Sequence, residues 1–122
     1  MKNCLIVDDS RVTRKVARRI LEELEFGVEE AEDGREGLEI CRRKMPDAIL
    51  LDCGLQGMTG VEFLRVLRRE PSGHGPIVVF CTIENDISLI TEAVTAGANE
   101  YMLKPFDSEI VKSVLSEVGL LN

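Results

Sequence analysis

Five polar residues stand where short apolar runs end, and their side chains together suit a divalent cation and a phosphoryl group. Asp8 and Asp9 follow the first run, and Asp52 follows a second. Thr82 closes a third run and Lys104 a fourth. Mg²⁺ prefers oxygen ligands such as carboxylates. A carboxylate can also form an aspartyl phosphate when the charge of the phosphoryl group is neutralised by Mg²⁺ and an ammonium.

The apolar runs are typical of buried parallel strands. They cover residues 4–7, 48–51, 77–81 and 101–103. Ligands of open α/β sheets bind outside the carboxyl ends of the strands. We therefore expect three carboxylates, a hydroxyl and an ammonium to converge on one edge of a sheet.

Each of these residues also has an ordinary structural interpretation. Asp8 and Asp9 are suited to cap a helix, and Thr82 is suited to cap another. Asp52 alone could be a turn residue, and Lys104 alone could be a solvated surface lysine. The joint pattern favours the functional interpretation, because separate strands each deliver a different and complementary group to the same edge.

Strand and helix patterns alternate five times along the chain. Strands are expected at residues 4–7, 28–31, 48–51, 77–81 and 100–103. The first helix is expected to be capped by Asp9 or Ser10 and to end at Gly27. Its apolar residues recur at helical spacing and are Val12, Val16, Ile20, Leu21 and Leu24.

The later helices are marked by their boundary residues. The second covers roughly residues 35–44 and stops before Pro46. The third follows a glycine-rich loop at 53–60, the fourth begins near 84–86 and carries Ile87, and the fifth begins near 107–108 and carries Ile110. Right-handed crossovers then place helices on both faces of a parallel sheet. The sequence predicts a doubly wound (βα)₅ protein of the α/β class.

Length and charge narrow the class of protein. The 122 residues and 13.6 kDa correspond to one domain, expected to span residues 1–122. A net charge of −7 argues against a nucleic-acid partner. The apolar runs are far shorter than a membrane span, and no signal-peptide pattern precedes the first strand. We expect a cytoplasmic protein without a membrane partner.

Five sequence blocks, in their order and spacing, resemble the receiver domain of two-component response regulators, especially the stand-alone chemotaxis CheY type. The blocks read LIVDDS, AILLD, GMTG, VVFCT and EYMLKPF. Each block alone is weakly informative, but the five together are highly specific. The resemblance covers nearly the whole chain and implies a flavodoxin-like sheet of strand order 2-1-3-4-5, the order found in CheY.

The resemblance also implies roles at the phosphorylation site. Asp52 would be the phosphoacceptor. Asp9 would bind Mg²⁺ directly and Asp8 mainly through water, and the backbone carbonyl of Gly54 would complete the metal site. Lys104 would contact the phosphoryl group, and its peptide bond to Pro105 would be cis.

The same resemblance implies a switch and two kinds of partner. Thr82 would move toward the phosphoryl group while the ring of Tyr101 turns inward. This movement would reshape the face of the fourth helix, fifth strand and fifth helix, where a downstream protein would bind. The phosphoryl donor would be a phosphohistidine on a histidine kinase or phosphotransfer protein.

The chain departs from the family pattern around the site. Leu55 and Gln56 stand where Met-Pro is usual, and Gly54 stands where a side chain such as Asn is common. Ile83 replaces a small residue. We expect Gly54, Ile83 and Glu84 to tune the reaction rates, with Ile83 partly shielding the phosphoryl group and Gly54 opening the opposite side.

The first helix carries a dense basic cluster, for which two interpretations remain open. It contains Arg11, Arg14, Lys15, Arg18 and Arg19. Such charge runs are usually a solvated face. The family resemblance instead implies that this helix docks on the kinase, with Arg14 and Arg18 as contacts.

Rival functions predict different residues. A haloacid-dehalogenase-type phosphatase needs a second Asp two residues after its nucleophile, where this chain has Gly54. A flavodoxin-like cofactor carrier needs a phosphate-binding first loop, where Asp8 and Asp9 would repel the phosphate. The favoured interpretation is a signalling module, not a conventional turnover enzyme; a phosphate sink or shuttle remains an alternative within this class.

Overall fold

The computed structural model describes residues 1–83 and 85–121. Five strands within this part of the chain form a single parallel sheet. The strands lie in the order β2-β1-β3-β4-β5, and this confirms the predicted doubly wound arrangement. Their bounds are β1 (Asn3–Val7), β2 (Gly27–Ala31), β3 (Ala48–Asp52), β4 (Ile77–Thr82) and β5 (Glu100–Leu103).

Each helix of the described residues begins after a side chain that accepts a hydrogen bond from its first turn. The helices are α1 (Arg11–Glu23), α2 (Gly34–Arg43), α3 (Gly60–Arg69), α4 (Ile87–Ala96) and α5 (Ser108–Glu117). The capping residues are Ser10, Asp33, Thr59, Asp86 and Asp107. These caps satisfy N–H groups that have no partner inside the helix, which fixes where each helix starts.

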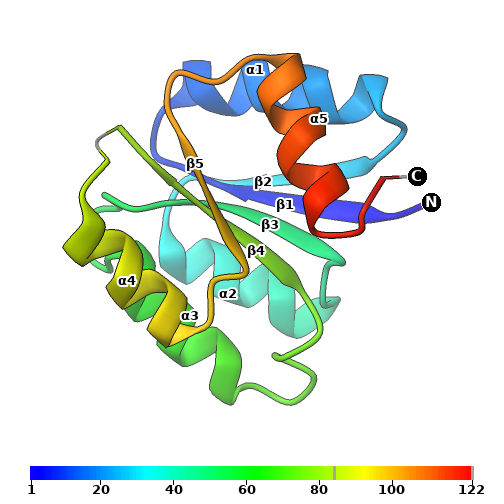
Figure 1. Cartoon of the computed structure of the whole chain (residues 1–122). Coiled ribbons are helices and arrows are strands. Elements are labelled where there is room, and N and C mark those ends of the chain that lie inside the picture. Colours follow the sequence, from blue (N-terminus) through cyan, green and yellow to red (C-terminus); the bar gives the residue numbers. More distant parts are fainter. Residues whose placement is uncertain (84, 122) are drawn as a thin grey trace.

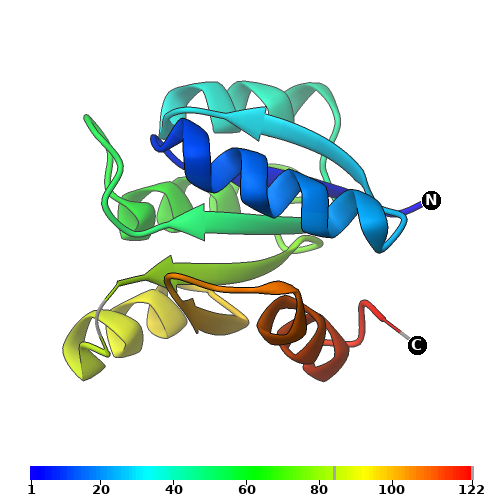
Figure 2. The ribbon, with the colours of Figure 1, turned by 90° about the horizontal axis from the view of Figure 1, so that it is seen from above.

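The helices form a layer on each face of the sheet (Figure 1). Helices α1 and α5 cover one face, and α2, α3 and α4 cover the other, as the view from above also shows (Figure 2). Side chains alternate between the two faces along each strand. In β1, for example, Leu5 and Val7 belong to the core under α2 and α3, whereas Cys4 and Ile6 belong to the core under α1 and α5.

The prediction that Gly27 ends the first helix was wrong. Helix α1 ends at Glu23, and Gly27 is the first residue of β2. The left-handed turn is made by Glu25, whose φ is 68°. The amide of Phe26 donates to the carbonyl of Leu21 and that of Glu25 to Glu22, the pattern of a Schellman motif. These bonds and the buried ring of Phe26 hold a glutamate in a conformation that glycine usually supplies.

Some residues of the expected apolar stripes stay exposed. Val12 and Val16 of α1 are 73% and 44% exposed, whereas Ala17, Ile20 and Leu21 are buried. Ile87 of the fourth helix and Ile110 of the fifth are also exposed. Within the part of the chain that the structure describes, no helix is long and apolar enough to cross a bilayer.

Candidate functional site

The strand ends that carry the candidate residues are aligned at one edge of the sheet. Strands β1, β3, β4 and β5 are successive neighbours. The register pairs Asp52 with Cys81 and Thr82 with Leu103. The ladder continues one residue further, because the amide of Lys104 donates to the carbonyl of Thr82 over 2.8 Å. Parallel pairing in this register therefore brings residues at the carboxyl ends of four different strands to the same level.

Three carboxylates meet at this edge, as predicted. Asp8, Asp9 and Asp52 each offer one oxygen, and these oxygens lie within 4.8 Å of one another. Asp8 and Asp52 are buried, with 3% and 8% of their surface exposed, whereas Asp9 is exposed. Two buried carboxylates and one open to solvent make an all-oxygen donor set, which fits a hard cation such as Mg²⁺ that keeps several waters.

Lys104 joins two of these carboxylates. Its Nζ atom donates to Oδ2 of Asp8 over 2.6 Å and to Oδ1 of Asp52 over 2.9 Å. Burial disfavours the charged ammonium, but the hydrogen bonds to Asp8 and Asp52 outweigh burial, so the pKa of Lys104 is raised. The ammonium is therefore positively charged at neutral pH and can face a phosphoryl oxygen as well as a carboxylate. The peptide bond between Lys104 and Pro105 is cis, as expected.

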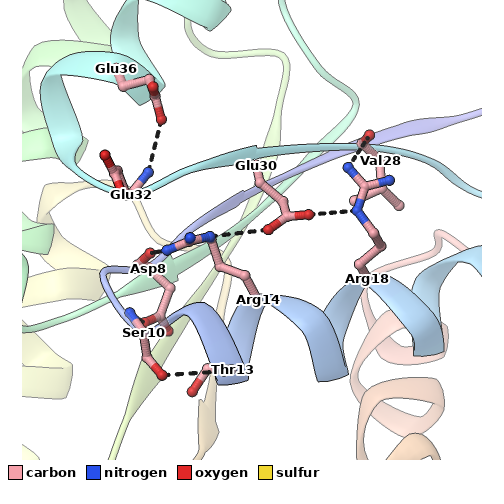
Figure 3. A network of polar contacts seen from close by, with 9 residues as sticks. All are labelled: Asp8, Ser10, Thr13, Arg14, Arg18, Val28, Glu30, Glu32 and Glu36. Atoms are coloured by element: carbon pink, nitrogen blue, oxygen red, sulfur yellow. Dashed lines mark hydrogen bonds and ion pairs between the residues drawn. The ribbon is translucent and has the colours of Figure 1, made fainter.

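Asp8 is also held by contacts that the sequence did not reveal. The amide of Ser10 donates to Oδ1 of Asp8 over 2.8 Å, and Nη1 of Arg14 donates to the Asp8 carbonyl over 2.7 Å. Arg14 in turn contacts Glu30 of β2, which also pairs with Arg18 (Figure 3). Arg14 and Arg18 lie 16 and 12 positions before Glu30 and on a different element. No local sequence motif predicts contacts between residues so far apart.

The loop after Asp52 leaves space on one side of the site and approaches closely on the other. Gly54 is exposed, and a Cβ atom built there would have no heavy atom within 4 Å. At Gly60 a Cβ atom would lie 2.6 Å from the carbonyl oxygen of Asp52. Glycine at position 60 therefore lets the start of α3 pack against the strand end that carries Asp52.

An open apolar pocket lies beside Lys104. It has a volume of about 420 Å³, and its lining residues are Val12, Thr13, Val16, Ile83, Lys104, Pro105 and Phe106. Ile83 is 72% exposed and forms part of this wall. Its position next to Lys104 is compatible with shielding of a group on Asp52, which remains a prediction. Glu84, the other expected rate-tuning residue on this loop, lies outside the described residues.

The two members of the expected switch pair differ in burial. Thr82 is 2% exposed at the end of β4, whereas Tyr101 of β5 is 36% exposed. In the register Tyr101 lies opposite Phe80, so it is set back from Thr82 along the strand direction. The switch role of this pair stays a prediction.

The basic residues of α1 fall into two groups. Arg14 and Arg18 are partly buried and bonded within the chain, to Glu30 and to backbone carbonyls. Arg11 and Lys15 are exposed. Arg19 is exposed and pairs with Glu23 one turn along the helix. The solvated-face interpretation is thus wrong for Arg14 and Arg18, and a kinase contact by either residue remains a prediction.

Comparison with known proteins finds relatives in sequence and in fold. Residues 4–116 match the response regulator receiver domain. The chain is 32% identical over 115 residues to the chemotaxis protein CheY of Pseudomonas aeruginosa, covering 93% of each chain. It is 34% identical over 118 residues to the chemotaxis protein CheY of Halobacterium salinarum, covering 96% of each. The structure of chemotaxis response regulator CheY4 of Vibrio cholerae superposes with a TM-score of 0.92 at 30% identity, covering 97% of this chain and 98% of that one.

Proposed function

The chain belongs to the response regulator receiver domain family, and from this premise we propose that Asp52 is its phosphoacceptor. It is a CheY-type receiver domain of two-component signalling. The observation that carries the assignment is the meeting of Asp52 with two further aspartates and an ammonium at the carboxyl edge of the sheet. We propose that residues 1–122 act as a single receiver domain.

Receiver domains use Mg²⁺ at a cluster of aspartates, and the cluster of this chain has the required donors. Asp9 and Asp52 are the proposed direct ligands, with the carbonyl of Gly54 as a third. The family resemblance favours contact through water for Asp8, whose two carboxylate oxygens each accept a hydrogen bond from the chain. When bound, Mg²⁺ would neutralise charge on the phosphoryl oxygens.

Phosphoryl transfer then forms one bond and breaks another. An oxygen of Asp52 forms a P–O bond as the P–N bond of a phosphohistidine breaks, and the electron pair stays on the leaving imidazole nitrogen, which takes up a proton. Lys104 stays charged and shifts its hydrogen bond from the Asp52 carboxylate to a phosphoryl oxygen. The buried hydroxyl of Thr82 is proposed to donate to a second phosphoryl oxygen.

The proposed result of phosphorylation is a change in the shape of one protein surface, and no product is released. We propose that Thr82 and Tyr101 couple phosphorylation to the face made by α4, β5 and α5, where a downstream protein binds. The CheY relatives are named as chemotaxis proteins, and chemotaxis is therefore the proposed setting. A role as phosphate sink or shuttle would use the same site with a second phosphotransfer protein in place of the downstream target.

Helix α1 is the proposed contact for the histidine kinase or phosphotransfer protein, through Arg14 and Arg18 and their exposed neighbours. Charge reversal at Arg14 or Arg18 would also break bonds within the chain. Arg11 and Lys15 are exposed, so reversing these two to Glu gives the cleaner test. Slower transfer from the kinase, with unchanged phosphorylation by a small acyl phosphate, is the expected result.

The family assignment favours signalling over the phosphatase interpretation. A haloacid-dehalogenase-type phosphatase would need a carboxyl group at position 54, and Gly54 offers none. Receiver domains are not conventional enzymes. For this chain, the proposed chemistry is limited to promoting its own phosphorylation and the later loss of the phosphoryl group.

The direct test is incorporation of phosphate from a small acyl phosphate. We expect one phosphate per chain that requires Mg²⁺, survives acid and is lost in base, as an acyl phosphate should be. The Asp52→Ala protein should incorporate none. Asp47→Asn is the matched control, because Asp47 is an exposed aspartate beside the first residue of β1, away from the site. Equal labelling of the Asp52→Ala protein would contradict the assignment.

A further inference from the structure

We propose that Arg14 is a positioning residue for the metal site and that Glu30 anchors it there. The inference rests on the proposed use of Mg²⁺ by Asp8, Asp9 and Asp52. It concerns how the loop between β1 and α1 is held, so that Asp9 is placed for the cation before the cation arrives.

The contact between Arg14 and Asp8 acts on the link between the two aspartates. Nη1 of Arg14 donates to the backbone carbonyl of Asp8 over 2.7 Å. This carbonyl belongs to the peptide unit whose nitrogen is that of Asp9. A peptide unit is planar, so fixing its oxygen also fixes the direction in which the chain enters Asp9. Asp9 is exposed and lies outside any helix or strand, and this peptide plane is therefore a main determinant of its position.

The other polar atoms of Asp8 are already used for different purposes. Its amide donates to the carbonyl of Ala31 over 3.0 Å, which extends the pairing of β1 with β2. Its carboxylate oxygens accept from Ser10 and from Lys104. Arg14 supplies a donor to the carbonyl, so that each polar atom of this buried residue has a partner inside the chain.

Glu30 holds the guanidinium of Arg14 in place. Nε of Arg14 donates to Oε1 of Glu30 over 3.0 Å, and the second oxygen of Glu30 accepts from Arg18 (Figure 3). Arg18 also donates to the carbonyl of Val28 on the same strand. The side chain of Arg14 is only 13% exposed. The planar fork of arginine reaches Asp8 and Glu30 at once, which the single ammonium of a lysine cannot reproduce in the same geometry.

A purely electrostatic role and a positioning role of Arg14 predict opposite effects of its removal on Mg²⁺ binding. As a cation beside a cation site, Arg14 should repel Mg²⁺, so its removal should tighten binding if only charge matters. If Arg14 acts by fixing the Asp8–Asp9 peptide, its removal should weaken binding. Arg18 shares the charge, the helix and the contact with Glu30, but its contacts are with Glu30, Glu22 and Val28 rather than with Asp8. It is therefore a matched control.

The test compares the Mg²⁺ dissociation constant of unphosphorylated wild-type, Arg14→Met and Arg18→Met proteins by titration calorimetry. We expect about a tenfold rise for Arg14→Met, the lower end for loss of an outer-shell partner, and no rise for Arg18→Met. Thermal unfolding should report a loss of stability in both. With a small acyl phosphate, the half-saturating Mg²⁺ concentration should rise for Arg14→Met and should stay at the wild-type value for Arg18→Met.

If Arg14→Met does not fold, Arg14→Lys keeps the charge and removes the fork, and its dissociation constant is expected to rise as well. Equal or tighter Mg²⁺ binding by the folded Arg14 variant would overturn the positioning role. An equal loss of Mg²⁺ affinity in Arg18→Met would overturn it as well. Failure of the wild-type protein itself to bind Mg²⁺ would instead refute the proposed function on which the inference rests.

Discussion

The Nζ atom of Lys104 lies 2.6 Å from Oδ2 of Asp8 and 2.9 Å from Oδ1 of Asp52. One ammonium group thus joins carboxylates at the carboxyl ends of two adjacent strands, β1 and β3. The exposed fractions of the three side chains are 13%, 5% and 11%. Charges this close and this shielded from water interact far more strongly than an exposed pair, so the ammonium offsets much of the repulsion between the two aspartates.

Removing the ammonium should therefore destabilise the protein, and the stability of the variant should then depend on Mg²⁺. We expect Lys104→Met to lower the free energy of unfolding by about 3 kcal/mol, because it leaves largely buried carboxylates without their cation. Added Mg²⁺ should raise the unfolding free energy of the variant more than that of wild type. Urea unfolding with and without Mg²⁺ measures both effects.

Lys112→Met is the control for the loss of one positive charge, because Lys112 is exposed on α5. It should change the free energy of unfolding little. If Lys104→Met were as stable as Lys112→Met, the bridging role of Lys104 in the fold would be refuted.

The wall of the pocket beside Lys104 should slow loss of the phosphoryl group. Ile83 is 72% exposed and lines that pocket. We expect Ile83→Ala to speed dephosphorylation about two- to threefold, which corresponds to about 0.5 kcal/mol of activation free energy. The decay of phosphorylated protein measures the rate. Ile87→Ala removes an equally exposed isoleucine on α4 and should leave the rate unchanged; no increase in Ile83→Ala would remove the shielding hypothesis.

The movement of Tyr101 can be followed without a label. The chain has one tyrosine and no tryptophan, so its intrinsic fluorescence comes from Tyr101. The Tyr101 residue is 36% exposed. If the ring turns inward on activation, iodide should quench its fluorescence less after treatment with Mg²⁺ and beryllofluoride, an acyl-phosphate mimic. Unchanged quenching, with the mimic shown to be bound, would count against the switch role.

The Glu30 network should stabilise the protein above the acid range only. Hydrogen bonds from Arg18 outweigh the effect of burial, and those from Arg14 add to them, so the pKa of Glu30 is lowered. A lowered pKa gives stability that is present above the unfolded value of about 4.3 and is lost as pH falls through the folded value. We expect Glu30→Gln to cost about 1 kcal/mol at pH 7.

This cost should shrink as the pH falls below about 4, which denaturant unfolding at several pH values would show. The matched control is Glu23→Gln, because Glu23 pairs with Arg19 at the exposed surface of α1. It should show little cost at either pH. A cost for Glu30→Gln that is the same at pH 3 and pH 7 would contradict the role of its charge.

The convergence of the site was predictable from the sequence because it depends on strand ends. Each apolar run was long enough to mark a buried strand, and in a parallel sheet the residue after each strand reaches the same edge. Asp8, Asp52 and Lys104 therefore came together as expected. Strand order came from the family resemblance, since apolar runs alone do not say which strands are neighbours.

The remaining features depend on contacts between distant residues. Glu30 meets Arg14 and Arg18 because β2 pairs with β1 and α1 packs over both, and no spacing along the chain encodes that meeting. The end of α1 was misplaced for a similar reason. A glycine is the usual signal for a helix end, but here hydrogen bonds and the buried Phe26 hold Glu25 in the left-handed conformation.

The most direct measurement locates the phosphoryl group on the chain. Borohydride reduction of an aspartyl phosphate gives homoserine at the modified position, which mass spectrometry of the digested protein identifies. After phosphorylation with Mg²⁺ and a small acyl phosphate, we predict homoserine at position 52 and unchanged aspartate at positions 8 and 9. Homoserine at another aspartate, or at none while phosphate is bound, would contradict the assignment of Asp52.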